Sequence, residues 1–276
     1  MVRRSKRFLM TKKAEAFFAL QVWVGYWGYF FLMALPQFVI ASCCCYWYFA
    51  NGKGGQMHSP VRKSLWRGFV THGGSIAFGA AVLAVVGLIK LLFDYMHGKL
   101  KELTANGSEN GCTKCVFGCL NCCLDCFERF IRFINRHAYI QIAMTGENFC
   151  KASEEAFFLV MRNVVRLGFV NGLGSLFTLI GEVFISLGTA FFAYFLVTNI
   201  DHYKQTISSP YVPTIFVGVI AYVVGSNFMS VYGTAADAII HVFCMDEEMH
   251  SYGAKYAPEL LREFIHEHVN ERLLKD

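Results

Sequence analysis

The chain has 276 residues, of which 55% are hydrophobic and 27 are phenylalanine, and its mean hydropathy is positive. Soluble domains rarely carry so much apolar surface, so the composition indicates a protein whose solvent is lipid. The formal net charge of +5 is modest. The sequence contains no phosphate loop, nucleophile elbow, dinucleotide-binding fingerprint or His-rich metal motif. We therefore expect an integral membrane protein that is not an enzyme, uses no cofactor and contacts membrane lipids rather than nucleic acid.

Four apolar runs are each long enough to cross the roughly 30 Å hydrocarbon core of a bilayer as a helix. They cover residues 14–50, 69–93, 173–197 and 212–244. A transmembrane barrel would instead show short alternating strands. We predict an all-α polytopic membrane bundle with four transmembrane helices. The first run is longer than a perpendicular crossing requires and contains Pro36, so we expect a tilted or kinked helix.

The runs divide the chain into four parts. Residues 1–98 hold the first helix pair and a basic flank, 99–170 form a Cys-rich amphipathic linker, 171–245 hold the second pair, and 246–276 form an amphipathic tail. Lys and Arg concentrate in the flank and the linker, and membrane proteins retain such residues in the cytosol. We therefore predict that both termini, the linker and the tail are cytosolic. The alternative is a lumenal linker, which would make the glycosylation sequon at Asn106 usable.

Two stretches of the linker have helical amphipathic spacing. Apolar and charged residues alternate over residues 127–136, and again over residues 156–170. Both stretches carry arginines in the middle of the run, which argues against a membrane crossing. We expect cytosolic helices that lie at the level of the lipid headgroups.

Six cysteines lie between residues 112 and 126. Two pairs have the two-residue gap of a zinc site, and they are Cys112, Cys115, Cys119 and Cys122. Only three residues separate the pairs, however, where about 12 to 20 are usual, so zinc is the weaker interpretation. On a helix the cysteines of residues 119–126 share one soft face, which favours packing or palmitoylation at the membrane. We expect this linker to carry no substrate chemistry of its own.

Polar residues follow one face of the third and fourth runs. Charged side chains within hydrocarbon are costly and often mark substrate pathways, so Glu182 and Asp237 are candidate substrate-binding residues. The alternative is that the polar residues only hold helices together. The third stripe comprises Ser175, Thr178, Ser186 and Thr189 beside Glu182, and the fourth comprises Ser226, Ser230, Thr234 and His241 beside Asp237.

The first run is rich in aromatic residues. Tyr26 and Trp27 lie well inside it, and aromatic faces bind quaternary ammonium groups by cation–π attraction. We therefore add Tyr26 and Trp27 to the candidate substrate-binding residues. Trp47 and Tyr48, at the end of the run, are typical of an interfacial aromatic belt.

Several segments resemble the choline transporter-like family, solute carrier family 44. They are CFERFIRFINRHAYIQIAMTGENFC in the linker, HGGSIAFGA from His72 to Ala80, and SVYGTAADAIIHVFCMDEE at the end of the last run. The resemblance covers nearly the whole chain and corresponds to the C-terminal half of the family's architecture. It implies a plasma-membrane transporter of choline or a related organic cation, with an organellar membrane as the alternative.

The chain also departs from the family pattern. The family commonly has Tyr-Glu where this chain has Tyr232-Gly233, and relatives often carry Lys at the position of Glu182. Asp237 matches the family's recurring acid. Two functions follow as hypotheses: a transporter of choline or a related cation, and a truncated relative that serves as a structural or accessory subunit of a larger membrane complex, with the missing N-terminal half as a further expected partner.

Overall fold

The computed structural model describes residues 12–50, 59–104, 111–201, 203, 209–250 and 253–265, and within these ranges the chain forms helices and no strand. The helices are α1 (Lys12–Phe49), α2 (Pro60–Trp66), a π-helix (Arg67–Thr71), α3 (Gly73–Thr104), α4 (Gly111–Thr145), α5 (Phe149–Arg162), α6 (Val164–Asn199), α8 (Tyr211–Met249) and α9 (Glu259–Ile265). The sequon at Asn106, the basic flank before Lys12 and the tail beyond Ile265 lie outside the described residues.

Four helices are long and apolar enough to cross a membrane. The segments are 16–49 in α1, 73–99 in α3, 164–199 in α6 and 211–249 in α8. The predicted all-α membrane bundle with four apolar spans is therefore confirmed. The long first run forms one helix with Pro36 inside it.

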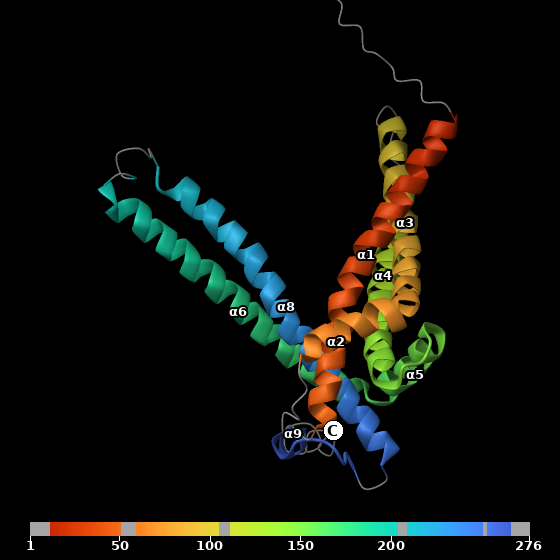
Figure 1. The fold of residues 1–276 in the computed structure, drawn as a ribbon. Helices are drawn as coiled ribbons and strands as arrows, with labels where there is room; N and C mark the ends of the chain where they lie inside the picture. The colour runs from red at the N-terminus through yellow and green to blue at the C-terminus, as the bar shows by residue number, and fades with distance from the viewer. Residues whose placement is uncertain are drawn as a thin grey trace, which may run out of the picture.

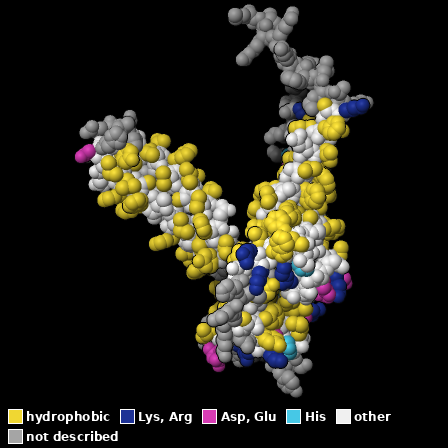
Figure 2. All heavy atoms as spheres, viewed as in Figure 1, with side chains coloured by type: hydrophobic (Ala, Val, Ile, Leu, Met, Phe, Trp, Pro, Cys, Tyr) yellow, Lys and Arg dark blue, Asp and Glu magenta, His cyan; other side chains and the backbone are white. Residues whose placement is uncertain are grey.

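The helices are arranged as an open V (Figure 1). One arm contains α1 and α3 with α4 packed against them, and the other contains α6 and α8. The arms meet at one end, where α2, α5 and α9 also lie. Hydrophobic side chains cover both arms, and basic side chains gather close to the junction (Figure 2). This apolar covering is what a lipid environment requires.

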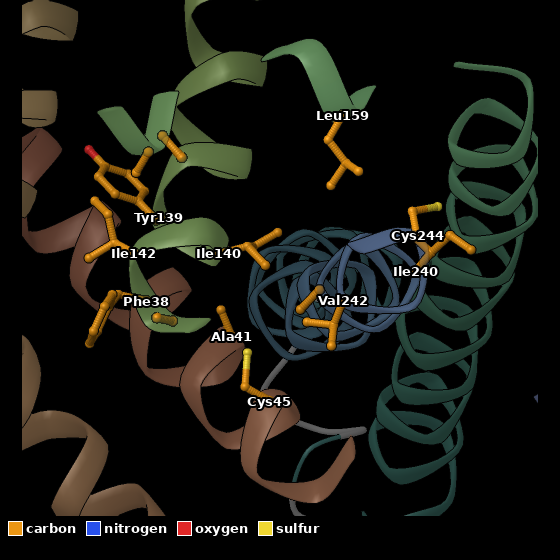
Figure 3. Close-up of a cluster of buried hydrophobic side chains, with 14 of the residues drawn as sticks. Phe38, Ala41, Cys45, Tyr139, Ile140, Ile142, Leu159, Ile240, Val242 and Cys244 are labelled. Carbon is orange, nitrogen blue, oxygen red and sulfur yellow. The ribbon is translucent and has the colours of Figure 1, made fainter. Parts of the chain in front are cut away.

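The core lies where the arms meet (Figure 3). It brings together three long helices and the short α5, with Phe38, Ala41 and Cys45 from α1, Tyr139, Ile140 and Ile142 from α4, Leu159 from α5, and Ile240, Val242 and Cys244 from α8. The amphipathic stretch around residues 127–136 is helical, as expected. It continues, however, into a buried segment that packs lengthwise against α1, α3 and α8, so the linker contributes to the core itself.

The absence of a side chain at Gly79 permits this packing. A Cβ atom added to Gly79 of α3 would lie 2.5 Å from the Phe149 ring and 2.6 Å from the Tyr139 hydroxyl. Such distances are far below van der Waals contact, so only glycine fits here. Asn135 of α4 then donates from Nδ2 to the Gly79 carbonyl at 2.8 Å.

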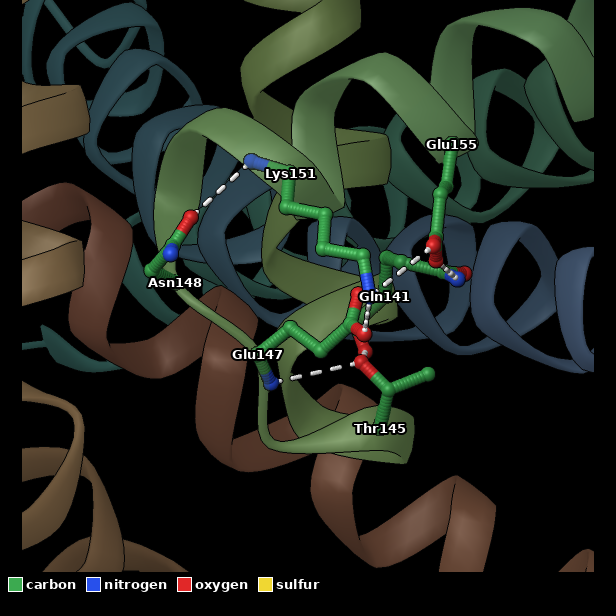
Figure 4. A network of polar contacts seen from close by, with 6 residues as sticks. All are labelled: Gln141, Thr145, Glu147, Asn148, Lys151 and Glu155. Carbon is green, nitrogen blue, oxygen red and sulfur yellow. Dashed lines mark hydrogen bonds and ion pairs between the residues drawn. The ribbon is translucent and has the colours of Figure 1, made fainter.

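A polar network holds the turn between α4 and α5 (Figure 4). Its members are Gln141, Thr145, Glu147, Asn148, Lys151 and Glu155. Asn148 caps α5 by accepting a hydrogen bond from the Lys151 amide at 3.0 Å. Gln141 donates to Glu155 at 2.9 Å, which ties α5 back to α4. Gly146 has a φ of 77°, a conformation that favours glycine, and it allows the sharp reversal.

Candidate functional site

A cavity of about 360 Å³ lies between α6 and α8, close to the junction of the arms. Its lining includes both intramembrane acids that the sequence singles out, Glu182 from α6 and Asp237 from α8. Ser175 and Thr178 of the third polar stripe also line it, together with Arg136 from α4. The structure therefore brings two predicted site residues, far apart in sequence, to one cavity.

Small residues make room for this cavity. A Cβ atom added to Gly174 would contact only Ala236, at 3.9 Å, and one added to Gly233 only Thr178, also at 3.9 Å. Elsewhere α6 and α8 pack closely, since a Cβ atom on Gly181 would overlap Met229 at 2.3 Å. The helices thus separate at the cavity because glycine and alanine face each other there without long side chains to fill the gap.

The charges around the cavity do not cancel. Arg136 donates from Nη1 to Oδ2 of Asp237 at 2.5 Å, which neutralises one acid. In the part of the chain that the structure describes, Glu182 makes no hydrogen bond or ion pair. Two carboxylates against one guanidinium leave one negative charge. Glu182 lies roughly 12 Å further along α6 than Gly174, at 1.5 Å per residue, so the pair and the unpaired acid are at opposite ends of the cavity.

The hydroxyl groups of the lining can accept hydrogen bonds. Ser175 donates to the Asn171 carbonyl at 2.8 Å, and Thr178 donates to the Gly174 carbonyl at 2.7 Å. Because each hydroxyl hydrogen is used on the backbone, the oxygen lone pairs are left for a ligand. The site therefore presents acceptors and a net negative charge, which suits a cation with a hydrogen-bond donor.

The fourth polar stripe is divided between different environments. Thr234 is buried and donates to the Ser230 carbonyl at 2.9 Å, while Ser230 is exposed and Ser226 half-buried. His241 is fully buried and contacts His137 Nδ1 at 3.2 Å and Gln141 Oε1 at 3.0 Å. The 360 Å³ cavity is lined by Asp237 alone from this stripe.

The two aromatic candidates of α1 lie away from these acids. Tyr26 lines a second cavity, of about 540 Å³, between α1, α3 and α4. Trp27 donates from its indole nitrogen to the Ala77 carbonyl at 2.9 Å, which fastens α1 to α3. In the second cavity the Arg132 guanidinium lies 5.0 Å from the centroid of the Phe30 ring, so a protein cation already occupies one aromatic face.

The cysteine face of α4 is exposed. Cys119, Cys122, Cys123 and Cys126 are all exposed free thiols. The side chains of Cys112 and Cys115 lie outside the described residues. Among the residues that are described, no group of three His, Cys, Asp or Glu is placed to hold a metal ion. Palmitoylation of this face stays a prediction.

Sequence reasoning did not identify Arg136 as a site residue. Its partner Asp237 is 101 residues away, and the arginine was assigned to a surface helix. The available signal was the spacing of Glu128, Arg132, Asn135 and Arg136, which places four polar residues on one face of α4.

The fold and the cavity define an α-helical integral membrane protein with charged residues between its spans. Residues 2–248 match the family described as plasma-membrane choline transporter, and the chain belongs to this family.

Individual relatives agree with this assignment. Choline transporter-like protein 2 of Danio rerio is 36% identical over 247 residues, which are 88% of this chain and 35% of that protein. The human protein of the same name is 34% identical over 235 residues, 83% of this chain and 33% of its own length. Choline transporter-like protein 4 of Xenopus laevis is 32% identical over 265 residues, 92% and 37% respectively. The chain thus spans about a third of the length of these relatives.

Proposed function

We propose that the cavity between α6 and α8 binds choline or a related organic cation, and that the chain takes part in carrying it across the plasma membrane rather than in catalysis. The observation that carries this proposal is the unpaired Glu182 in a cavity of about 360 Å³ within an apolar span. An acid at membrane depth is costly unless a cation or water meets it. The volume falls within the roughly 300–1,000 Å³ that is usual for small-molecule sites.

The other lining residues have supporting roles in this proposal. Arg136 pairs with Asp237, so Glu182 supplies the uncompensated charge for a quaternary ammonium group. Ser175 and Thr178 supply oxygen acceptors for the hydroxyl of choline. Tyr26 and Trp27 do not line this cavity, so an aromatic contribution from α1 would act at a different step of the route.

Equilibrium binding of radiolabelled choline to the chain in lipid nanodiscs tests the site. We expect Glu182→Gln to weaken binding at least about tenfold, equivalent to about 1.4 kcal/mol. Glu154→Gln is the matched control, because Glu154 is an exposed acid on α5 away from the cavity. Equal affinity in the Glu182→Gln variant and the unaltered chain would exclude Glu182 as the cation partner.

A second candidate function is that of a structural or accessory subunit of a larger membrane assembly. One observation favours it: within the described structure, Leu167 is the one buried residue of α6. Choline uptake by liposomes that contain only this chain separates the two functions. Uptake above that of empty liposomes supports transport, and binding without uptake together with co-purification of other membrane proteins supports the subunit.

A further inference from the structure

Helix α4 has an apolar exposed face and a polar face that contacts α3. Val116, Leu120, Phe127 and Phe130 are about half exposed and follow one side of the helix. The opposite side carries Asp125, Glu128 and Asn135, which contact Lys90 or the Gly79 carbonyl of α3. A helix on the surface of a water-soluble domain has the reverse arrangement. The observed one is typical of a helix in lipid whose polar side chains face other protein segments.

α4 lies beside α3 along the stretch from His72 to Lys90. Near one end Lys90 contacts Asp125 at 2.7 Å, and further along Asn135 bonds to Gly79. At the other end a Cβ atom on Gly146, directly after α4, would lie 3.8 Å from the His72 ring, directly before α3. The stretch from His72 to Lys90 corresponds to about 27 Å at 1.5 Å per residue. This length is close to the roughly 30 Å thickness of the hydrocarbon core.

The charges of α4 along this length have protein partners. Asp125 and Glu128 both contact Lys90, Glu128 also pairs with Arg132 at 2.5 Å, and Arg136 pairs with Asp237. Pairing towards the bundle interior is how membrane helices accommodate charge. Arg129 is exposed and interacts electrostatically with Asp125, and its long side chain reaches headgroups or water by snorkelling.

We propose that α4 crosses the membrane as a fifth helix, in addition to α1, α3, α6 and α8. With five crossings the two ends of the chain lie on opposite sides of the membrane. The start of α1 and the far end of the α3–α4 pair are then on one side. The junction of the V, with α2, α5 and α9, is then on the other side. Of the exposed cysteines of α4, Cys126 lies within this length, and Cys119, Cys122 and Cys123 lie in the turns before it.

This placement gives the inner face of α4 a function. Glu128 and Arg132 line the 540 Å³ cavity, and Arg136 lines the 360 Å³ cavity. Between them Arg132, Asn135 and Arg136 line a smaller cavity of about 100 Å³. α4 therefore supplies one polar wall to three successive cavities inside the membrane. A helix on the membrane surface would not reach these cavities.

Native lysines report the topology without any substitution. Exposed lysines lie at the start of α1 (Lys13), between α1 and α3 (Lys63), near the end of α3 (Lys99), between α4 and α6 (Lys151) and after α8 (Lys255). Sealed vesicles with a single orientation can be selected through an epitope tag fused after residue 276. A membrane-impermeant amine reagent is then added outside, followed by an isotopically distinct reagent after permeabilisation, and peptides are read by mass spectrometry.

We expect the external reagent to label Lys63, Lys151 and Lys255, and the second reagent to label Lys13 and Lys99. If α4 is cytosolic and the chain crosses four times, the external reagent labels Lys13, Lys99, Lys151 and Lys255. Of these five lysines, Lys63 alone is then labelled by the second reagent. That second grouping would overturn the fifth crossing. Because the experiment measures sidedness alone, it is independent of whether the cavity binds choline.

Discussion

Arg136 of α4 and Asp237 of α8 form an ion pair between two helices that are 101 residues apart in sequence. The Asp237 side chain is 7% exposed and that of Arg136 45% exposed, so the pair is half-shielded from solvent. It joins the two arms of the V at the wall of the cavity between α6 and α8. The same contact thus fixes the arms and removes one of the two negative charges of the cavity.

Arg136→Gln should destabilise the protein, because it leaves Asp237 as a buried charge without its partner. We expect a cost of about 1–2 kcal/mol, below that of a fully buried pair, because Arg136 is partly exposed. The double variant Arg136→Gln/Asp237→Asn should recover part of this loss. Thermal unfolding of the four proteins in one detergent measures the coupling, and strictly additive effects would show that the pair contributes nothing.

Gly79→Ala should be strongly destabilising, because the new methyl group would overlap Phe149 and Tyr139. Such overpacking costs about 1–3 kcal/mol. Gly74→Ala is the matched control on the same helix, where an added Cβ atom meets nothing within 4 Å. The melting temperature of the Gly74 variant should equal or exceed that of the unaltered chain. Similar melting temperatures for both variants would argue against the close contact between α3 and α4.

Tyr48→Phe should loosen the attachment of the segment after α8. Tyr48 donates to Asp246 at 2.9 Å, and both residues are fully buried. Removing the hydroxyl costs about 1–3 kcal/mol when the remaining acceptor is buried. Asp246 also accepts from the Tyr256 amide, so proteolysis around Tyr256 should accelerate in the variant. Tyr29→Phe, at an exposed position, should change neither the melting temperature nor the cleavage rate.

Stability should fall as the solution becomes acidic, in part through His72. Burial, followed by the nearby Arg67, lowers the pKa of His72 below its ordinary value. At pH values between the lowered pKa and about 6.5, the unfolded chain binds a proton that the folded chain does not. The free energy of unfolding therefore decreases as the pH decreases through this range. His72→Gln should therefore show a smaller drop in melting temperature between pH 7.5 and 5.5. An unchanged drop would assign the effect to other groups.

The sequence predicts the spans well, because an apolar run of sufficient length has few alternatives to a membrane helix. The boundary differs: the second run begins at residue 69 by composition, whereas α3 begins at Gly73 after a π-helix. Hydropathy does not register that change of hydrogen-bond pattern. Glu182 and Asp237 were recognised from their cost in lipid. Their shared cavity depends on Gly174 lying opposite Ala236 and Gly233 lying opposite Thr178 across two helices, which no local pattern reveals.

The central claim is that Glu182 recognises the positive charge of the ligand. The most direct measurement compares choline with 3,3-dimethyl-1-butanol, its uncharged carbon isostere, as competitors for labelled choline on the nanodisc-embedded chain and on Glu182→Gln. We predict that the unaltered chain prefers choline at least about tenfold and that the variant loses most of this preference. An equal preference for choline in both proteins would contradict this proposal, because a residue other than Glu182 would then recognise the positive charge.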